Sequence, residues 1–448
     1  MSGHFEAHVA TAILGMDTLW GGDVMNPSGL GRFIADSWFS DAPLPPAYTH
    51  PAAATLRASG GVSVDAPDRA ALKAYLAEVD VPGAIASLAE DASRMEGLRG
   101  RYVAGLAQSF QVMWELALER MGEGDPVPYV RCVRASTGQP PTPSAPAEKR
   151  RQVRELLAEA GFPSAGDADL LGAVEAWRAQ RLVPMASVRS QGAAYIARYA
   201  ALSERNLRPH LPAELRDVPM DNITFLPIKD AWFSGSMNYL GRARRPDGRP
   251  EYEATYEINA SLAITVPEFE QLVTHEVVPG HVATFAFLQD RYWRRQVGFE
   301  ASVLTMNTRA ATLFEGIANN AILIAHGVSD VEQVPDPDLR IGLLLALLQD
   351  DAKNQASYLL WQEGRPEAEV AALLPREFLV SEERAGKFAG AWGRHPLMGR
   401  MYLPCYRAGT DLVARLLRTH APERLFPVLY GCRGLVDATT IEEALRPA

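Results

Sequence analysis

The stretch Thr274-His275-Glu276-Val277-Val278-Pro279-Gly280-His281 decides how the rest of the sequence is interpreted. It holds two histidines, with a glutamate beside the first and a Pro-Gly step before the second. Imidazole is a common zinc ligand, and a glutamate beside a ligating histidine can take a proton from a metal-bound water. The stretch therefore predicts a metal site.

The spacing of the two histidines predicts a break in the helix that carries them. The ordinary zincin motif, His-Glu-x-x-His, places its histidines four residues apart on one helical face. A spacing of six turns through about 240° on a regular helix, so His275 and His281 would not reach one ion. Pro279 lacks a backbone donor and Gly280 tolerates strained angles. We therefore predict that two residues loop out and bring His281 beside His275.

The composition predicts a folded protein of the cytoplasm. The chain has 448 residues, of which 47% are hydrophobic and 22% charged, and its formal net charge is -10. This acidic balance argues against a nucleic-acid or anionic-membrane partner. Three scattered cysteines do not make a disulfide framework. The sequence opens without a signal peptide, and its longest apolar run is too short to span a membrane.

Helical patterns dominate on both sides of the motif and predict a mainly α protein. Residues 1–210 are interpreted as an N-terminal helical region. It has an irregular, Pro/Gly-rich start over residues 1–64, with one short helix, and a long loop at 122–147. Residues 211–448 are interpreted as the catalytic, metal-binding region of the same continuous fold.

A small sheet is predicted directly before the motif. Residues 223–226, 236–240 and 252–258 have strand-like composition, and a Pro-Asp-Gly turn signal between the last two favours a hairpin. We expect residues 252–258 to pair with an extended peptide, as edge strands do. Thr265 and Glu268 then form a capping box at the start of the motif helix.

A third protein ligand is needed, because catalytic zinc usually takes three and keeps a fourth position for water. Glu315 is the best candidate. It lies in the apolar segment Ala311-Thr-Leu-Phe-Glu-Gly-Ile-Ala318, where a carboxylate is costly to bury unless it is paired or metal-bound. A glutamate that faces solvent or has only a local role is the alternative.

Three segments resemble a known family. His275-Glu-Val-Val-Pro-Gly-His281 matches the His-Glu-x-x-Pro-Gly-His signature of the bacterial domain of unknown function 885 family. Phe314-Glu-Gly-Ile-Ala318 and Tyr406-Arg-Ala-Gly409 resemble its Glu-Gly-Trp-Ala and Tyr-Lys-Ile-Gly segments, and the likeness covers about residues 220–448. That family looks like a set of zincin-type metallopeptidases with a large helical fold akin to thermostable carboxypeptidases and oligopeptidases.

The resemblance implies a zinc-dependent peptidase of carboxypeptidase or oligopeptidase type. His275, His281 and Glu315 would bind one Zn²⁺, and Glu276 would be the general base. Tyr406 would donate a hydrogen bond to the oxyanion, although a core tyrosine is the alternative there. Arg400, Arg407 and His395 are candidates for binding a substrate carboxylate.

Departures from the family pattern leave the substrate open. The family's Glu-Gly-Trp-Ala-x-Tyr-x-Glu is Glu315-Gly-Ile-Ala-Asn-Asn-Ala-Ile322 here, without the Trp, the Tyr and the second acidic residue. Its Gly-Leu-His segment appears near Leu348-Gln-Asp-Asp351, without the histidine. A metal-dependent hydrolase of a non-peptide amide or ester, or a catalytically degenerate metal-binding protein, therefore stays open, as does a homodimer.

Overall fold

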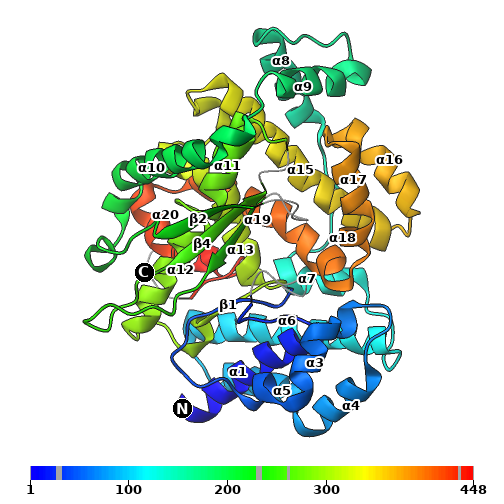
Figure 1. Cartoon of the computed structure of the whole chain (residues 1–448), viewed down its shortest axis with the longest axis vertical. Helices are drawn as coiled ribbons and strands as arrows, with labels where there is room; N and C mark the ends of the chain where they lie inside the picture. The colour runs from blue at the N-terminus through cyan, green and yellow to red at the C-terminus, as the bar shows by residue number, and fades with distance from the viewer. Residues whose placement is uncertain (1, 27–32, 229–234, 260–262, 432–434, 447–448) are drawn as a thin grey trace.

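The computed structural model describes residues 2–26, 33–228, 235–259, 263–431 and 435–446. It shows a mainly helical protein with two small sheets, as the sequence predicts (Figure 1). None of the helices in these ranges is both long and apolar enough to cross a bilayer.

The N-terminal region is more regular than the sequence predicts. Helix α1 spans 18 residues, so the prediction of an irregular start with one short helix is wrong. Its side chains are buried over most of its length, and such a helix lacks the polar stripe that would reveal it. Helix α7 lies inside the predicted 122–147 loop, where flanking prolines conceal it. The elements are α1 (Ser2–Leu19), β1 (Ala35–Trp38), α2 (Pro46–Thr49), α3 (Pro51–Ser59), α4 (Arg69–Glu78), α5 (Val81–Ser93), α6 (Gly97–Met121), α7 (Tyr129–Thr137), α8 (Ala147–Glu159), α9 (Leu170–Ala179) and α10 (Val188–Asn206).

The C-terminal region begins with the predicted sheet and continues as helices. Short 3-10 turns connect several of its elements. These elements are β2 (Ile223–Ile228), β3 (Gly235–Tyr239), β4 (Ala254–Asn259), α11 (Val266–Glu276), α12 (His281–Trp293), β5 (Val303–Thr305), α13 (Arg309–Asn319), α14 (Ala321–His326), α15 (Pro337–Trp361), α16 (Glu367–Phe378), α17 (Glu382–Ala389), α18 (Ala391–Arg394), a π-helical turn (Met398–Tyr402), α19 (Leu403–Thr419), α20 (Pro422–Leu429) and α21 (Ile441–Ala444).

The larger sheet has the strand order β2-β4-β3. Strand β4 pairs antiparallel with β3, with Ala254 opposite Tyr239, which confirms the predicted hairpin. On its other side β4 pairs in parallel with β2, with Ala254 opposite Ile223. The expectation that residues 252–258 form an edge strand is therefore wrong, because both sides of β4 are hydrogen-bonded. The sheet contacts α11 and α12, beside the motif, as predicted.

Two hydrophobic clusters form the main core. The first runs from Phe5 to Leu445 in the sequence, so the N- and C-terminal regions share it, and it includes α1, α6, the larger sheet, α11 and α13. The second is built from α8, α9, α15, α16 and α17. Helix α15 belongs to both, because Leu343 lies in the first cluster and Leu344 in the second. Figure 1 shows α8 and α9 at one end of the molecule and α1 to α6 at the other.

Helices α13 and α19 touch through their backbones. A Cβ added to Gly316 would lie 2.2 Å from the carbonyl oxygen of Gly409, and one added to Gly409 would lie 1.9 Å from that of Thr312. Only glycine fits at both positions. This contact brings Glu315 on α13 close to the π-helical turn that leads into α19, where the Tyr402 hydroxyl donates to its carboxylate.

We predict that Gly316→Ala destabilises the protein by about 1–3 kcal/mol, because overpacking forces the two backbones apart. Gly172→Ala on α9 is the matched control: its Cβ would meet nothing within 4 Å. Alanine there should leave stability unchanged or raise it by roughly 0.5–1 kcal/mol. Urea unfolding of both variants checks this, and equal effects would contradict the proposed helix contact.

Candidate metal centre

The junction between α11 and α12 is a widened turn. The Gly280 N–H donates to the Thr274 carbonyl at 3.0 Å, and the Ala283 N–H donates to the Val277 carbonyl at 3.2 Å. Both bonds reach six residues back, whereas a regular α-helix reaches four. The prediction that two residues loop out at Pro279-Gly280 is confirmed.

The widened turn places the two motif histidines side by side. Their ring centroids lie 4.7 Å apart, and the ring planes meet at 88°. Gly280 is required in this turn, because a Cβ there would lie 1.9 Å from the carbonyl oxygen of His275. The Tyr430 hydroxyl donates to the Pro279 carbonyl at 3.1 Å and so supports the turn from α20. His281 is further packed against the ring of Phe285.

Glu315 of α13 completes the group that the sequence predicts. Its Oε2 lies 3.7 Å from Nε2 of His275, and its Oε1 lies 3.7 Å from Nε2 of His281. The three candidate ligand atoms all lie within 4.8 Å of one another. Ligand atoms of a tetrahedral zinc site stand roughly 3.3–3.5 Å apart, given metal–ligand distances of about 2.0–2.1 Å. The separations in the structure are somewhat longer than these, and they identify a group that could hold a metal ion without identifying the metal.

Burial shifts the pKa of two of these three groups, His275 and Glu315, in directions that suit a cation. It lowers the pKa of His275 well below its usual value, with a further contribution from His281, so the imidazole is neutral. Burial also raises the pKa of Glu315 to about 7. Its Oε2 is buried and accepts no hydrogen bond from the described residues. A buried carboxylate oxygen that faces a neutral imidazole fits a divalent metal ion.

Asn319 fixes which nitrogen of His275 can bind metal. The Asn319 amide donates from Nδ2 to Asp350 Oδ2 and to Thr410 Oγ1, both at 2.8 Å. Its Oδ1 must then face Nδ1 of His275, at 2.9 Å, and accept the proton that Nδ1 carries. Nε2 keeps its lone pair and faces Glu315, an arrangement typical of metal-binding histidines. The sequence analysis missed this role, because it treated Asn319 only as a departure from the family pattern.

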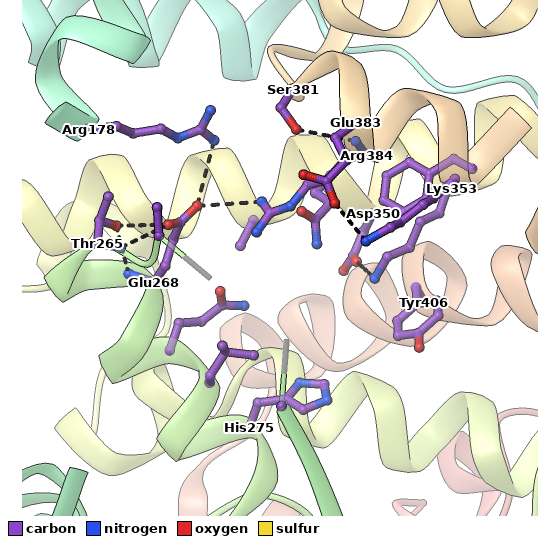
Figure 2. Close-up of a pocket in the computed structure, with 18 of the residues that line it drawn as sticks. Arg178, Thr265, Glu268, His275, Asp350, Lys353, Ser381, Glu383, Arg384 and Tyr406 are labelled. Atoms are coloured by element: carbon purple, nitrogen blue, oxygen red, sulfur yellow. Dashed lines mark hydrogen bonds and ion pairs between the residues drawn. The ribbon is translucent and has the colours of Figure 1, made fainter. Parts of the chain in front are cut away.

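A cleft of about 520 Å³ opens beside His275, between α9, α11, α15 and α17. Figure 2 shows its labelled side chains, with Arg178 and Arg384 both directed at Glu268. Their guanidinium nitrogens lie 3.7 and 3.5 Å from the Glu268 carboxylate. Glu276 and Tyr406, the predicted base and oxyanion donor, also line the cleft.

Tyr406 keeps its proton at neutral pH. Burial raises the pKa of its hydroxyl well above the usual value, and the negative charge of Glu315 adds to this effect. Its ring lies edge-on to Tyr402, with 5.1 Å between centroids. A protonated hydroxyl on the cleft wall can donate a hydrogen bond to a bound molecule.

Arg400, Arg407 and His395 are the predicted carboxylate binders. None of the three is among the described residues that line this cleft. Arg400 is buried and forms a two-point ion pair with Glu119. Arg407 donates to the carbonyl of Pro143 at 3.0 Å. His395 packs against Phe33, with 4.2 Å between ring centroids, and burial lowers its pKa to about 4. Their proposed role gains no support from the geometry.

Comparisons with known proteins bear on the fold alone. No protein-family model and no curated protein matches the chain. A solved structure of a candidate lipoprotein from Colwellia psychrerythraea is similar, with a TM-score of 0.52 and 14% identity, over 81% of this chain and 66% of that chain, just under two thirds. A candidate lipoprotein of unknown function from Shewanella oneidensis gives a TM-score of 0.48 and 13% identity, over 89% and 75%. The resemblance to the domain of unknown function 885 family stays a prediction.

We predict that the protein binds one equivalent of Zn²⁺ and that His281→Ala or Glu315→Gln removes a ligand. Each should weaken zinc binding by more than the roughly 10–100-fold loss typical of a lost supporting partner. Competition with a chromophoric chelator measures this. His4→Ala, at an exposed position of α1, is the control and should bind zinc as the native protein does. Native affinity in Glu315→Gln would contradict the assigned ligand set.

We predict that Asn319→Leu weakens zinc binding about 10–100-fold, because His275 loses the acceptor that fixes its tautomer. Asn320→Leu is a matched control. Asn320 is also buried and donates to the carbonyls of Gly316 and Thr410, without a hydrogen bond to either histidine. It should lower stability without changing zinc affinity once the protein is folded. A similar zinc affinity in the two variants would show that Asn319 has no special role.

Proposed function

We propose that the chain is a zinc-dependent hydrolase that cleaves amide bonds in short peptides. The observation that carries this proposal is the position of Glu276, which follows a candidate metal ligand and lines the same cleft. A metal site in a closed core has no substrate access, whereas this one opens onto a cavity large enough for a ligand.

His275, His281 and Glu315 are the residues that would hold the metal. A zinc ion there supplies Lewis acidity, which lowers the pKa of water towards neutrality. The Glu276 carboxylate accepts a proton from the attacking water and returns it to the leaving nitrogen. The Tyr406 hydroxyl, which keeps its proton, donates a hydrogen bond to the carbonyl oxygen as negative charge develops there.

The cleft supports a small, polar substrate. Its volume of about 520 Å³ lies within the roughly 300–1,000 Å³ of typical small-ligand sites. Acidic and basic side chains both line it, among them Glu268, Glu383, Arg178 and Arg384. Both charge signs suit a short peptide, which carries a charged group at each end.

We predict that Glu276→Gln lowers kcat for peptide hydrolysis by about 10²–10⁴-fold, the usual contribution of a general base, and leaves zinc affinity unchanged. The measurement is a peptide-library digest followed by mass spectrometry, with zinc content determined on the same samples. Glu175→Gln is the matched control, because Glu175 lines the same cleft from α9 and pairs with Arg178. The Glu175→Gln variant should keep the peptidase activity of the native protein.

Two results would count against this proposal. Persistent activity in Glu276→Gln would show that the base is assigned wrongly. Hydrolysis of a parallel ester or acyl-amide panel, with no peptide cleaved, would show that the peptidase assignment is wrong while metal-dependent hydrolysis stands.

A further inference from the structure

The cleft contains a buried ammonium group that neither the metal ligands nor the general base accounts for. Lys353 on α15 lines the cleft, yet the residue is only 7% exposed. Its Nζ lies 3.0 Å from Asp350 Oδ1 and 3.4 Å from the ring centroid of Tyr406. Figure 2 shows Lys353 between these two side chains on one wall of the cleft.

The ammonium keeps one donor for a ligand. A lysine ammonium has three N–H groups. Asp350 accepts one of them and the face of the Tyr406 ring receives another. Among the described residues, no other side chain or carbonyl accepts a hydrogen bond from Nζ. The remaining donor is available to the cleft, and the burial of the lysine strengthens its attraction for an anion.

Lys353 is held in one position by the surroundings of its partner. Arg178, Arg384 and Lys387 form ion pairs with other carboxylates that line the cleft. Lys353 pairs with Asp350, whose carboxylate also accepts hydrogen bonds from Asn319 and Thr410. These contacts fix the carboxylate, and through it the position of the ammonium on the cleft wall.

A short chain of hydrogen bonds connects this ammonium to the metal centre. Nδ1 of His275 lies 2.9 Å from Asn319, Asn319 lies 2.8 Å from Asp350, and Asp350 lies 3.0 Å from Lys353. The cation is therefore fixed next to the predicted reaction centre. In a C-terminal residue the free carboxyl carbon is separated from the scissile carbonyl carbon by only the amide nitrogen and Cα, a span of roughly 4 Å. A cation beside the centre is where that carboxylate would lie.

We propose that Lys353 binds the free α-carboxylate of the residue that supplies the leaving nitrogen, so that the last amide bond of the substrate is the one cleaved. This inference rests on the proposed function and names its substrate class: peptides and N-acyl amino acids with a free C-terminus. The aromatic face of Tyr406 holds the ammonium while the Tyr406 hydroxyl serves the scissile carbonyl. One pair of side chains then binds the two groups that flank the leaving nitrogen, the scissile carbonyl of the preceding residue and the free carboxylate of the last one.

The test compares matched substrates that differ only in the C-terminal group, a free acid and its amide, in native protein and in Lys353→Met. Native protein should prefer the acid by roughly 10- to 100-fold in kcat/KM, the usual effect of a charged hydrogen bond. Lys353→Met should lose that preference through a raised KM for the acid, with the amide little affected. Lys387→Met, on the neighbouring helix α17 of the same cleft, should keep the preference, and Lys353→Arg should restore part of it.

Two results would overturn the inference: equal turnover of acid and amide by native protein, or an equal loss of both in Lys353→Met at native stability and zinc content. The second result is what a purely structural lysine predicts.

A binding measurement separates this inference from the proposed function. If native protein cleaves neither substrate, the hydrolase proposal fails. Calorimetry with N-acetylphenylalanine and its amide then decides the carboxylate site without turnover. A preference for the acid that Lys353→Met removes supports the site, and binding without a preference overturns it.

Discussion

The buried carboxylate of Asp350 holds the site together. It accepts hydrogen bonds from Asn319 and Thr410 on one oxygen and faces the Lys353 ammonium on the other. A buried carboxylate is costly unless it is paired and hydrogen-bonded, and Asp350 has three donors here, one of them charged. The same contacts fix the donors in return. The tautomer of His275 and the position of the cleft cation thus depend on one side chain of α15.

Close contact between α13 and α19 makes this network possible. Gly316 and Gly409 let the two backbones meet without intervening side chains. Each helix then delivers polar groups to the centre, Glu315 and Asn319 from α13 and Thr410 from α19. The helices that carry the motif histidines pack against α13 from the other side. Polar atoms of α13 and α19 therefore meet inside a helical core. Residues larger than glycine at the contact would hold the two helices apart and separate these atoms.

The features that the sequence predicts correctly depend on residues that are neighbours along the chain. Pro279 and Gly280 act on their own turn, so the widened junction follows from the motif alone. The role of Asn319 depends on α15 and α19, which are distant in the sequence, and no local signal predicts it. Arg400 and Arg407, predicted to bind a substrate carboxylate, instead donate to Glu119 and to the Pro143 carbonyl, which are distant in the sequence. The turn predicts the hairpin, and the composition predicts a strand at 223–226, but no local signal predicts that this strand pairs in parallel with the far side of β4.

The two walls of the cleft belong to different hydrophobic clusters, and specific contacts hold these walls together. One wall, α11, belongs to the first hydrophobic cluster, and the opposite wall, α9 and α17, belongs to the second. Between the walls, Glu268 receives Arg178 and Arg384 at 3.7 and 3.5 Å. Backbone hydrogen bonds join the same two walls: the Val183 N–H donates to the Ile264 carbonyl and the Val266 N–H donates to the Arg181 carbonyl, both at 2.9 Å. The attraction between exposed charges is screened by salt, whereas hydrogen bonds between neutral backbone groups are not. The α9 edge of the cleft is therefore held to α11 by main-chain contacts as well as by ion pairs.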